Sequence, residues 1–127
     1  MIYLDNAATT ALSPAAIQAM TKTMTVFGNP SSTHSHGREA SKLLRQARED
    51  IAQSLHTQSN KIIFTSGGTE SNNTAIKGYA LRHQNRGKHI VTTAIEHHAV
   101  LEVVEYLVDK FGFEATFVQP VDGQIRA

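Results

Sequence analysis

The most informative part of the chain is the run Ile62-Ile63-Phe64-Thr65-Ser66-Gly67-Gly68-Thr69-Glu70-Ser71-Asn72. An apolar segment rich in β-branched residues leads into two glycines and then into a segment compatible with a helix. This order predicts a strand, a tight turn and a helix start. Glycine lets the backbone come close to a bound group, and the first turn of a helix offers unpaired N–H groups at a positive dipole end. The run therefore indicates a site for an anion such as phosphate.

Residues 66–69 are called the glycine turn below. The hydroxyl groups of Thr69 and Ser71 are further candidate donors to an anion. A purely structural interpretation stays open, because strands often enter helices through Gly and Ser. The spacing contains neither Gly-x-x-x-x-Gly-Lys-Ser/Thr nor Gly-x-Gly-x-x-Gly, so the common nucleoside triphosphate and dinucleotide fingerprints are absent. We expect a different ligand with a phosphate group.

Composition narrows the class of protein. The chain has 127 residues, 40% of them hydrophobic and 18% charged, which suits one soluble domain with a core. Its net charge of +1 gives no basic field for nucleic acid, and no apolar run is long enough for a membrane span. The N-terminal residues do not resemble a signal peptide, so we expect a cytoplasmic protein. The absence of cysteine excludes disulfides and thiolate chemistry within this chain.

Hydrophobic periodicity and turn residues predict alternating helices and strands. Ser13 is expected to cap a helix that starts at Pro14, and Asn85-Arg86-Gly87 to stop a later one. The expected helices are 14–26, about 40–55, 69–84 and 100–111, with a loop at 27–33 and strands at 62–65, 89–93 and 114–118.

This alternation predicts an α/β fold with a mainly parallel sheet flanked by helices. Ligands of such sheets bind at the carboxyl ends of the strands. The glycine turn follows one expected strand, and the segment from Ile95 to His98 follows the next. We therefore expect the glycine turn and the pair His97-His98 to face one crevice.

Adjacent histidines point in different directions, so His97 and His98 are unsuited to hold a metal together. We expect no metal site. One of the two, facing the crevice, is a candidate acid/base or stacking group, although a hydrogen-bonded surface histidine explains the residue equally well. Glu70 is explained by its place in the first turn of a helix, where a carboxylate is favoured.

Five ordered motifs resemble the NifS/IscS-type cysteine desulfurases, which are class V aminotransferases of fold type I. They are Tyr3-Leu4-Asp5-Asn6-Ala7-Ala8-Thr9-Thr10, Phe27-Gly28-Asn29-Pro30-Ser31-Ser32, His34 with Gly37, Phe64 through Asn72, and Glu96-His97-His98-Ala99-Val100. The resemblance covers essentially the whole chain. It implies that 1–26 is an N-terminal segment and helix, and that 27–127 is the first part of a large domain that binds pyridoxal 5′-phosphate.

The resemblance also implies roles for single residues. Gly68 and Thr69 match positions that hold the cofactor phosphate, and His97 matches the residue that stacks on the pyridine ring and takes part in proton transfer. Ala8 and Thr9 match a segment at the substrate entrance. Asn29 lies in a loop that resembles one near the site and the dimer interface.

The implied reaction converts L-cysteine to L-alanine and leaves the sulfur as an enzyme persulfide, which feeds iron–sulfur cluster or other sulfur biosynthesis. The implied parent is a cytoplasmic homodimer that passes sulfur to an acceptor such as an iron–sulfur scaffold. The family's Schiff-base lysine and catalytic cysteine fall later in the family order than these 127 residues, so we expect this chain alone to be inactive. The alternatives are another class V aminotransferase, a selenocysteine lyase, or a non-enzymatic module that binds a phosphate ligand or a partner.

Overall fold

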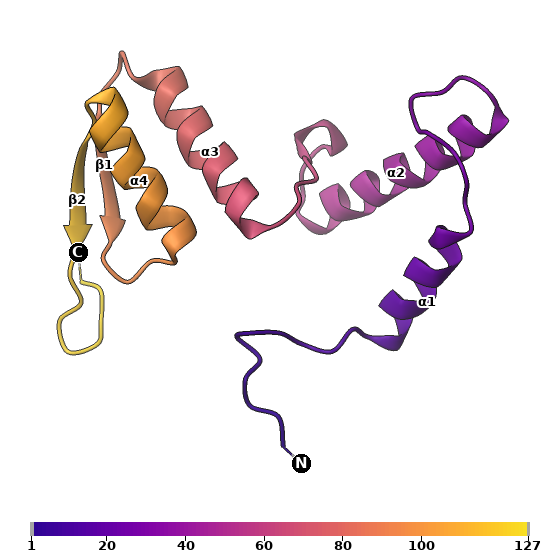
Figure 1. Cartoon of the computed structure of the whole chain (residues 1–127), viewed down its shortest axis with the longest axis horizontal. Coiled ribbons are helices and arrows are strands. Elements are labelled where there is room, and N and C mark those ends of the chain that lie inside the picture. The colour runs from indigo at the N-terminus through magenta and orange to yellow at the C-terminus, as the bar shows by residue number, and fades with distance from the viewer. Residues whose placement is uncertain (1, 127) are drawn as a thin grey trace. The chain divides into compact units, whose positions relative to one another are not determined.

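The computed structural model describes residues 2–126 and divides them into two compact units, one ending at Ile63 and one beginning at Phe64 (Figure 1). This division does not test the domains expected from the sequence, 1–26 and 27–127, which stay a prediction. Among the helices described, none has the length and apolar character needed to cross a membrane.

The first unit is built from helices. Helix α1 spans Pro14–Met24, and the Ser13 side chain caps it by accepting a hydrogen bond from the Ala16 N–H at 3.2 Å. This confirms the expected cap, although the helix ends two residues earlier than expected. Helix α2 spans Ser35–Ser54 and is followed by the short 3-10 helix η1, Ser59–Lys61.

The loop between α1 and α2 is tightly packed at two glycines. A β-carbon at Gly28 would lie 2.3 Å from the backbone oxygen of His36, and one at Gly37 would lie 2.3 Å from that of Ser32. Real β-carbons do not come that close to backbone atoms. The loop and the first turn of α2 therefore fit together only because both positions are glycine.

The second unit is a β–α–β unit with one more helix. The two strands pair in parallel, in a register that runs from His89 opposite Glu114 to Thr93 opposite Val118. This confirms the expected parallel sheet flanked by helices. The elements are α3 (Gly68–His83), β1 (His89–Thr93), α4 (His98–Phe111) and β2 (Glu114–Val118).

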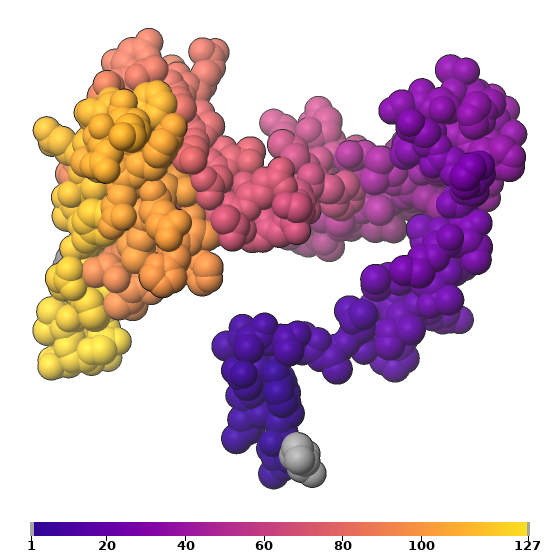
Figure 2. Space-filling view, in the orientation of Figure 1, coloured from indigo at the N-terminus to yellow at the C-terminus, as the bar shows by residue number. Residues whose placement is uncertain are grey.

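The hydrophobic core of the second unit lies on the buried side of α4. Val103, Leu107 and Phe113 are buried together, and Leu107 is fully buried. In Figure 2 the atoms of α4 and β2 (orange to yellow) form one closely packed surface. The partly buried residues packed against this cluster come from α3, β1 and α4 and include Ile76, Ala80, Leu81, Ile90, Val108 and Phe111.

The strand expected at 62–65 was predicted wrongly. Ile62 has extended dihedral angles (φ −90°, ψ 122°), but the segment pairs with neither strand of the sheet, which has the order β1-β2. Local sequence favours an extended backbone here, whereas a strand also needs a hydrogen-bonding neighbour along its edge. Among the described residues no strand pairs with this segment.

The glycine stop expected at Gly87 is also wrong. Helix α3 ends at His83 with Gln84 in right-handed conformation, and the chain turns there through a hydrogen bond from the Arg86 N–H to the His83 carbonyl. A glycine stop of this kind occurs instead at Gly112, which has φ 65° and ends α4.

Candidate functional site

Helix α3 begins without a side-chain cap. Its N-cap residue is Gly67, and no side chain of the described residues accepts a hydrogen bond there as a cap. The other three α-helices do have such caps, from Ser13, His34 and His97. The first N–H groups of α3 thus remain directed outward at the positive end of the helix dipole.

The space beside the two glycines of the turn is open. A β-carbon added at Gly67 or Gly68 would meet no atom within 4 Å. Thr69 follows in the first turn and is exposed, so its hydroxyl is accessible from solvent. Backbone donors, a hydroxyl and open space are the chemistry that a phosphate group requires.

The glycine turn is fixed on one side by Glu70. The Glu70 carboxylate oxygen Oε2 accepts hydrogen bonds from both the backbone N–H and the hydroxyl of Ser66, each at 2.7 Å. These two hydrogen bonds lower the pKa of Glu70 below its ordinary value, and the bond from the backbone N–H has the larger effect. The carboxylate is therefore ionised at neutral pH while it holds Ser66.

A second link crosses the same turn. The Thr65 hydroxyl donates to the Gly67 carbonyl at 3.2 Å, and its oxygen lies 2.6 Å from the Ser71 hydroxyl. Either hydroxyl can be the donor in the hydrogen bond between Thr65 and Ser71. Ser71, a candidate phosphate donor from the sequence, is therefore engaged with Thr65 in this structure.

His97 is the N-cap of α4. Its Nδ1 accepts a hydrogen bond from the Ala99 N–H at 3.1 Å, which leaves Nε2 as the outward ring nitrogen. The ring is exposed, and the rings of His97 and His98 are 6.2 Å apart and inclined at 68°. The two rings thus point in different directions, as adjacent positions predict.

Helices α3 and α4 pack against each other and begin at the same end of the second unit, the end toward which β1 and β2 point (Figure 1). The loop after β1 is held there by a hydrogen bond from the Thr93 hydroxyl to Glu96 at 2.8 Å. The glycine turn and His97 therefore lie at one end of one unit. Within residues 2–126 no cluster of three His, Cys, Asp or Glu side chains is placed to hold a metal ion.

The remaining predicted residues lie in the first unit. Ala8 is exposed and lies in a turn, where its N–H donates a hydrogen bond to the Asp5 carbonyl at 3.2 Å. Thr9 is the next residue. The Asn29 side chain accepts from the Ser31 N–H at 2.9 Å, which shapes its loop. A role for these three residues near a substrate stays a prediction.

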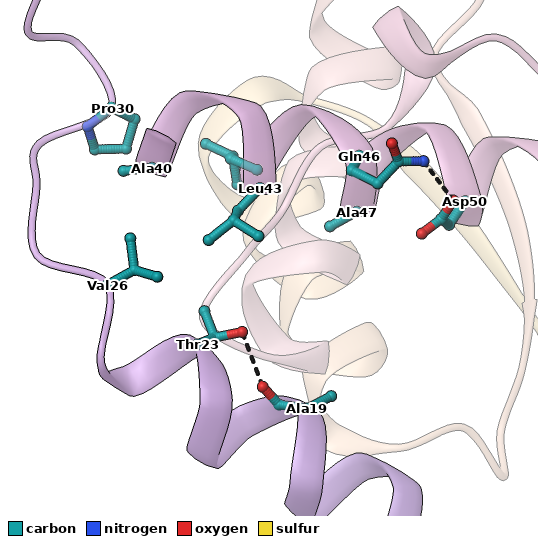
Figure 3. A pocket seen from close by; sticks show the side chains of 10 residues that line it. Ala19, Thr23, Val26, Pro30, Ala40, Leu43, Gln46, Ala47 and Asp50 are labelled. Atoms are coloured by element: carbon teal, nitrogen blue, oxygen red, sulfur yellow. Dashed lines mark hydrogen bonds between the residues drawn. The ribbon is translucent and has the colours of Figure 1, made fainter. Parts of the chain in front are cut away.

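Sequence reasoning missed the link between Ser66 and Glu70. The signal was present, because an acidic residue at the third helical position often bonds backward to the residues before the helix. Sequence reasoning also missed an apolar groove of about 560 Å³ in the first unit (Figure 3). Val26, Leu43 and Ala47 line it, and a hydrogen bond of 2.9 Å between Gln46 and Asp50 borders it.

The chain matches the family described as aminotransferase class V over residues 2–126, and it belongs to that family. It is 52% identical over 122 residues to the cysteine desulfurase IscS of Dictyoglomus turgidum, covering 95% of this chain and 30% of that protein. It is 45% identical over 131 residues to the IscS-like cysteine desulfurase of Mycobacterium tuberculosis, covering 100% of this chain and 33% of that protein.

Two solved structures have the same fold. A NifS-like protein matches 89% of this chain with a TM-score of 0.82 and 39% identity, over 31% of its own length. DndA from Streptomyces lividans matches 92% of this chain with a TM-score of 0.75 and 42% identity, over 33% of its own length. The chain thus spans about a third of the length of the relatives it matches.

These similarities confirm the resemblance to the N-terminal part of NifS/IscS cysteine desulfurases. The family depends on pyridoxal phosphate.

Proposed function

We propose that the chain is the N-terminal part of a pyridoxal phosphate-dependent cysteine desulfurase, which converts L-cysteine to L-alanine and transfers the sulfur to an enzyme cysteine. The observation that carries the proposal is the 52% identity to a cysteine desulfurase over nearly the whole chain. The solved structure of SspA in complex with cysteine, which is 37% identical to this chain, supports L-cysteine as the substrate.

In this proposal Gly68 and Thr69 hold the cofactor phosphate through their backbone N–H groups and the Thr69 hydroxyl. The uncapped start of α3 and the open space beside its glycines support this role. When bound, pyridoxal phosphate supplies an electron sink for cleavage of the carbon–sulfur bond. The cofactor ring would lie against His97, whose Nε2 is the nitrogen left to exchange a proton.

The chain alone is proposed to be inactive. A persulfide forms on a cysteine, and this sequence contains none. The lysine that forms a Schiff base with the cofactor is also not part of the family motifs that this chain contains. The complete enzyme is proposed to be a cytoplasmic homodimer that delivers sulfur to an acceptor such as an iron–sulfur scaffold, with Ala8, Thr9 and Asn29 near its substrate.

A chimeric enzyme tests the proposal. Residues 2–126 replace the matching N-terminal part of the Dictyoglomus turgidum desulfurase, and L-alanine formed from L-cysteine is measured together with the sulfide that an added dithiol reductant releases from the enzyme persulfide. We expect the chimera to be active and the 127-residue chain alone to release no alanine. An inactive but folded chimera that binds the cofactor, or substantial alanine from the chain alone, would contradict the proposal.

Variants of the chimera separate the two uses of His97. Asparagine is a good N-cap, so His97→Asn keeps the start of α4 but removes the ring, whereas His97→Ala removes both. We expect both variants to lose at least 100-fold in alanine release, a typical loss for a proton-transfer group. Only His97→Ala should also lose stability, by about 1 kcal/mol. The neighbouring exposed residue gives the matched control His98→Asn, which should keep its activity.

A further inference from the structure

Two side-chain links span the two glycines, and they join Thr65 and Ser66 to the first turn of α3. Ser66 is held by Glu70 through two hydrogen bonds of 2.7 Å, and Thr65 lies 2.6 Å from the Ser71 hydroxyl. The first link uses a backbone N–H and a hydroxyl, and its acceptor is a single carboxylate oxygen. A charge-assisted pair of this kind holds its partner more firmly than two neutral hydrogen bonds do.

The hydrogen bonds between Ser66 and Glu70 leave other donors of the glycine turn available to a ligand. They engage both donors of Ser66, but they do not use the N–H groups of Gly68 and Thr69. The carboxylate therefore draws Ser66 back toward α3 and fixes the backbone on which the two glycines lie. Glycine gains the most conformational freedom when such a restraint is lost, because it has no side chain to limit its dihedral angles.

We propose that Glu70 is a positioning residue for the cofactor phosphate: by holding Ser66 it fixes the glycine turn in advance, so that the N–H groups of Gly68 and Thr69 are already directed at the phosphate. This inference rests on the proposed function and adds a residue to it. Glu70 itself does not touch the phosphate. Binding to a turn that is already ordered avoids the entropy cost of ordering it at the moment of binding.

The opposite effect has a physical basis as well, which makes the sign of the result decisive. A carboxylate close to a phosphate repels it, and removal of that negative charge would then tighten binding. Positioning predicts weaker phosphate binding without Glu70, whereas repulsion predicts stronger binding. Solvent and ions at this exposed site screen the repulsion between the carboxylate and a phosphate. The hydrogen bonds that the carboxylate accepts from Ser66 also offset part of its negative charge.

The experiment uses the ¹⁵N-labelled 127-residue chain. Pyridoxal phosphate and, separately, inorganic phosphate are titrated while the amide signals of Gly68 and Thr69 are followed by nuclear magnetic resonance. The variants are Glu70→Ala and Glu70→Gln, and the matched control is Glu105→Gln, an exposed glutamate of α4. Pyridoxal without its phosphate is the control ligand.

We expect Glu70→Ala to weaken binding of both phosphate ligands about tenfold. This corresponds to about 1.4 kcal/mol, close to the backbone entropy of ordering one residue. Glu70→Gln keeps one acceptor oxygen and should show a smaller loss, and Glu105→Gln should bind as the unchanged chain does. Any binding of pyridoxal should not differ among the variants. Faster amide exchange at Ser66 and Gly68 in Glu70→Ala, with exchange in α4 unchanged, would show that the glycine turn has loosened.

The possible outcomes separate this inference from the proposed function. If the unchanged chain binds both phosphate ligands and the Glu70 variants bind them equally well or better, the positioning role is refuted and the phosphate site stands. If the unchanged chain binds neither ligand, both the site at Gly68 and Thr69 and the role of Glu70 are refuted. A loss that appears equally with pyridoxal would assign Glu70 to general structure and would also refute the inference.

Discussion

The packing of the loop between α1 and α2 predicts that Gly37→Ala destabilises the first unit. A β-carbon at residue 37 would lie 2.3 Å from the Ser32 backbone oxygen and 2.8 Å from that of Asn29. Alanine gains about 1 kcal/mol over glycine inside a helix, whereas forcing such an overlap costs about 1–3 kcal/mol or more. The Ser32 β-carbon also lies 2.7 Å away, and because it is attached directly to the backbone, none of the three atoms can move aside by a side-chain rotation. With the cost of a backbone overlap this close at the upper end of that range, we expect a net loss of about 2 kcal/mol in the free energy of unfolding.

The assay is urea unfolding followed by far-ultraviolet circular dichroism, with Gly78→Ala as the matched control. Gly78 also lies within a helix, but a β-carbon there would meet no atom within 4 Å. The control should therefore gain about 1 kcal/mol from helix propensity alone. The close fit of loop and helix would be refuted if Gly37→Ala were as stable as Gly78→Ala. In the chimeric enzyme, Gly37→Ala should also reduce activity if Asn29 lies near the substrate.

Three further predictions concern the core, a cap and a carboxylate. Leu107→Ala should lower the free energy of unfolding of the second unit by about 3 kcal/mol, measured in urea, whereas Val91→Ala, at a side chain 64% exposed, should change it by less than about 0.5 kcal/mol. Ser13→Ala should cost about 1 kcal/mol and lower amide protection at the start of α1; unchanged protection would contradict the cap. The hydrogen bonds from Ser66 lower the pKa of Glu70, so their stabilisation is complete above the usual carboxyl value of 4.5 and is lost as the pH falls through the lower, folded-state pKa. The Ser66 amide proton shift should follow that titration, and a shift change centred above 4.5 would contradict the link.

Features fixed by neighbours in sequence could be predicted well. The Ser13 cap, the strands at 89–93 and 114–118 and the parallel pairing all follow from local patterns and from the length of the helix between the strands. The helix starts were also placed within a residue or two at 14 and 69. The cap and the helix starts depend on contacts a few residues apart, and the parallel pairing follows from the helix that separates two strands; a single sequence displays both signals directly.

Two kinds of feature could not be predicted: those that depend on residues far away in the chain, and those for which more than one local conformation is possible. The segment 62–65 has strand-forming residues but lacks a neighbouring strand among the residues described. Gly87 and Gly112 both follow helices, yet only Gly112 adopts the left-handed conformation. At the site, periodicity indicated the start of α3, but it did not reveal that Glu70 bonds backward to Ser66 or that Ser71 pairs with Thr65.

The absence of a strand at 62–65 does not loosen the candidate site, because the site is positioned by helices. The glycine turn is linked to the first turn of α3 through Glu70. Helix α3 packs on α4 through Ile76, Ala80 and Leu81, which surround the buried cluster at Leu107. His97 caps the start of α4 itself. The distance between the proposed phosphate donors and the His97 ring is thus set by the packing of two helices, and a substitution in their shared core should disturb the site more than one in the extended segment before it.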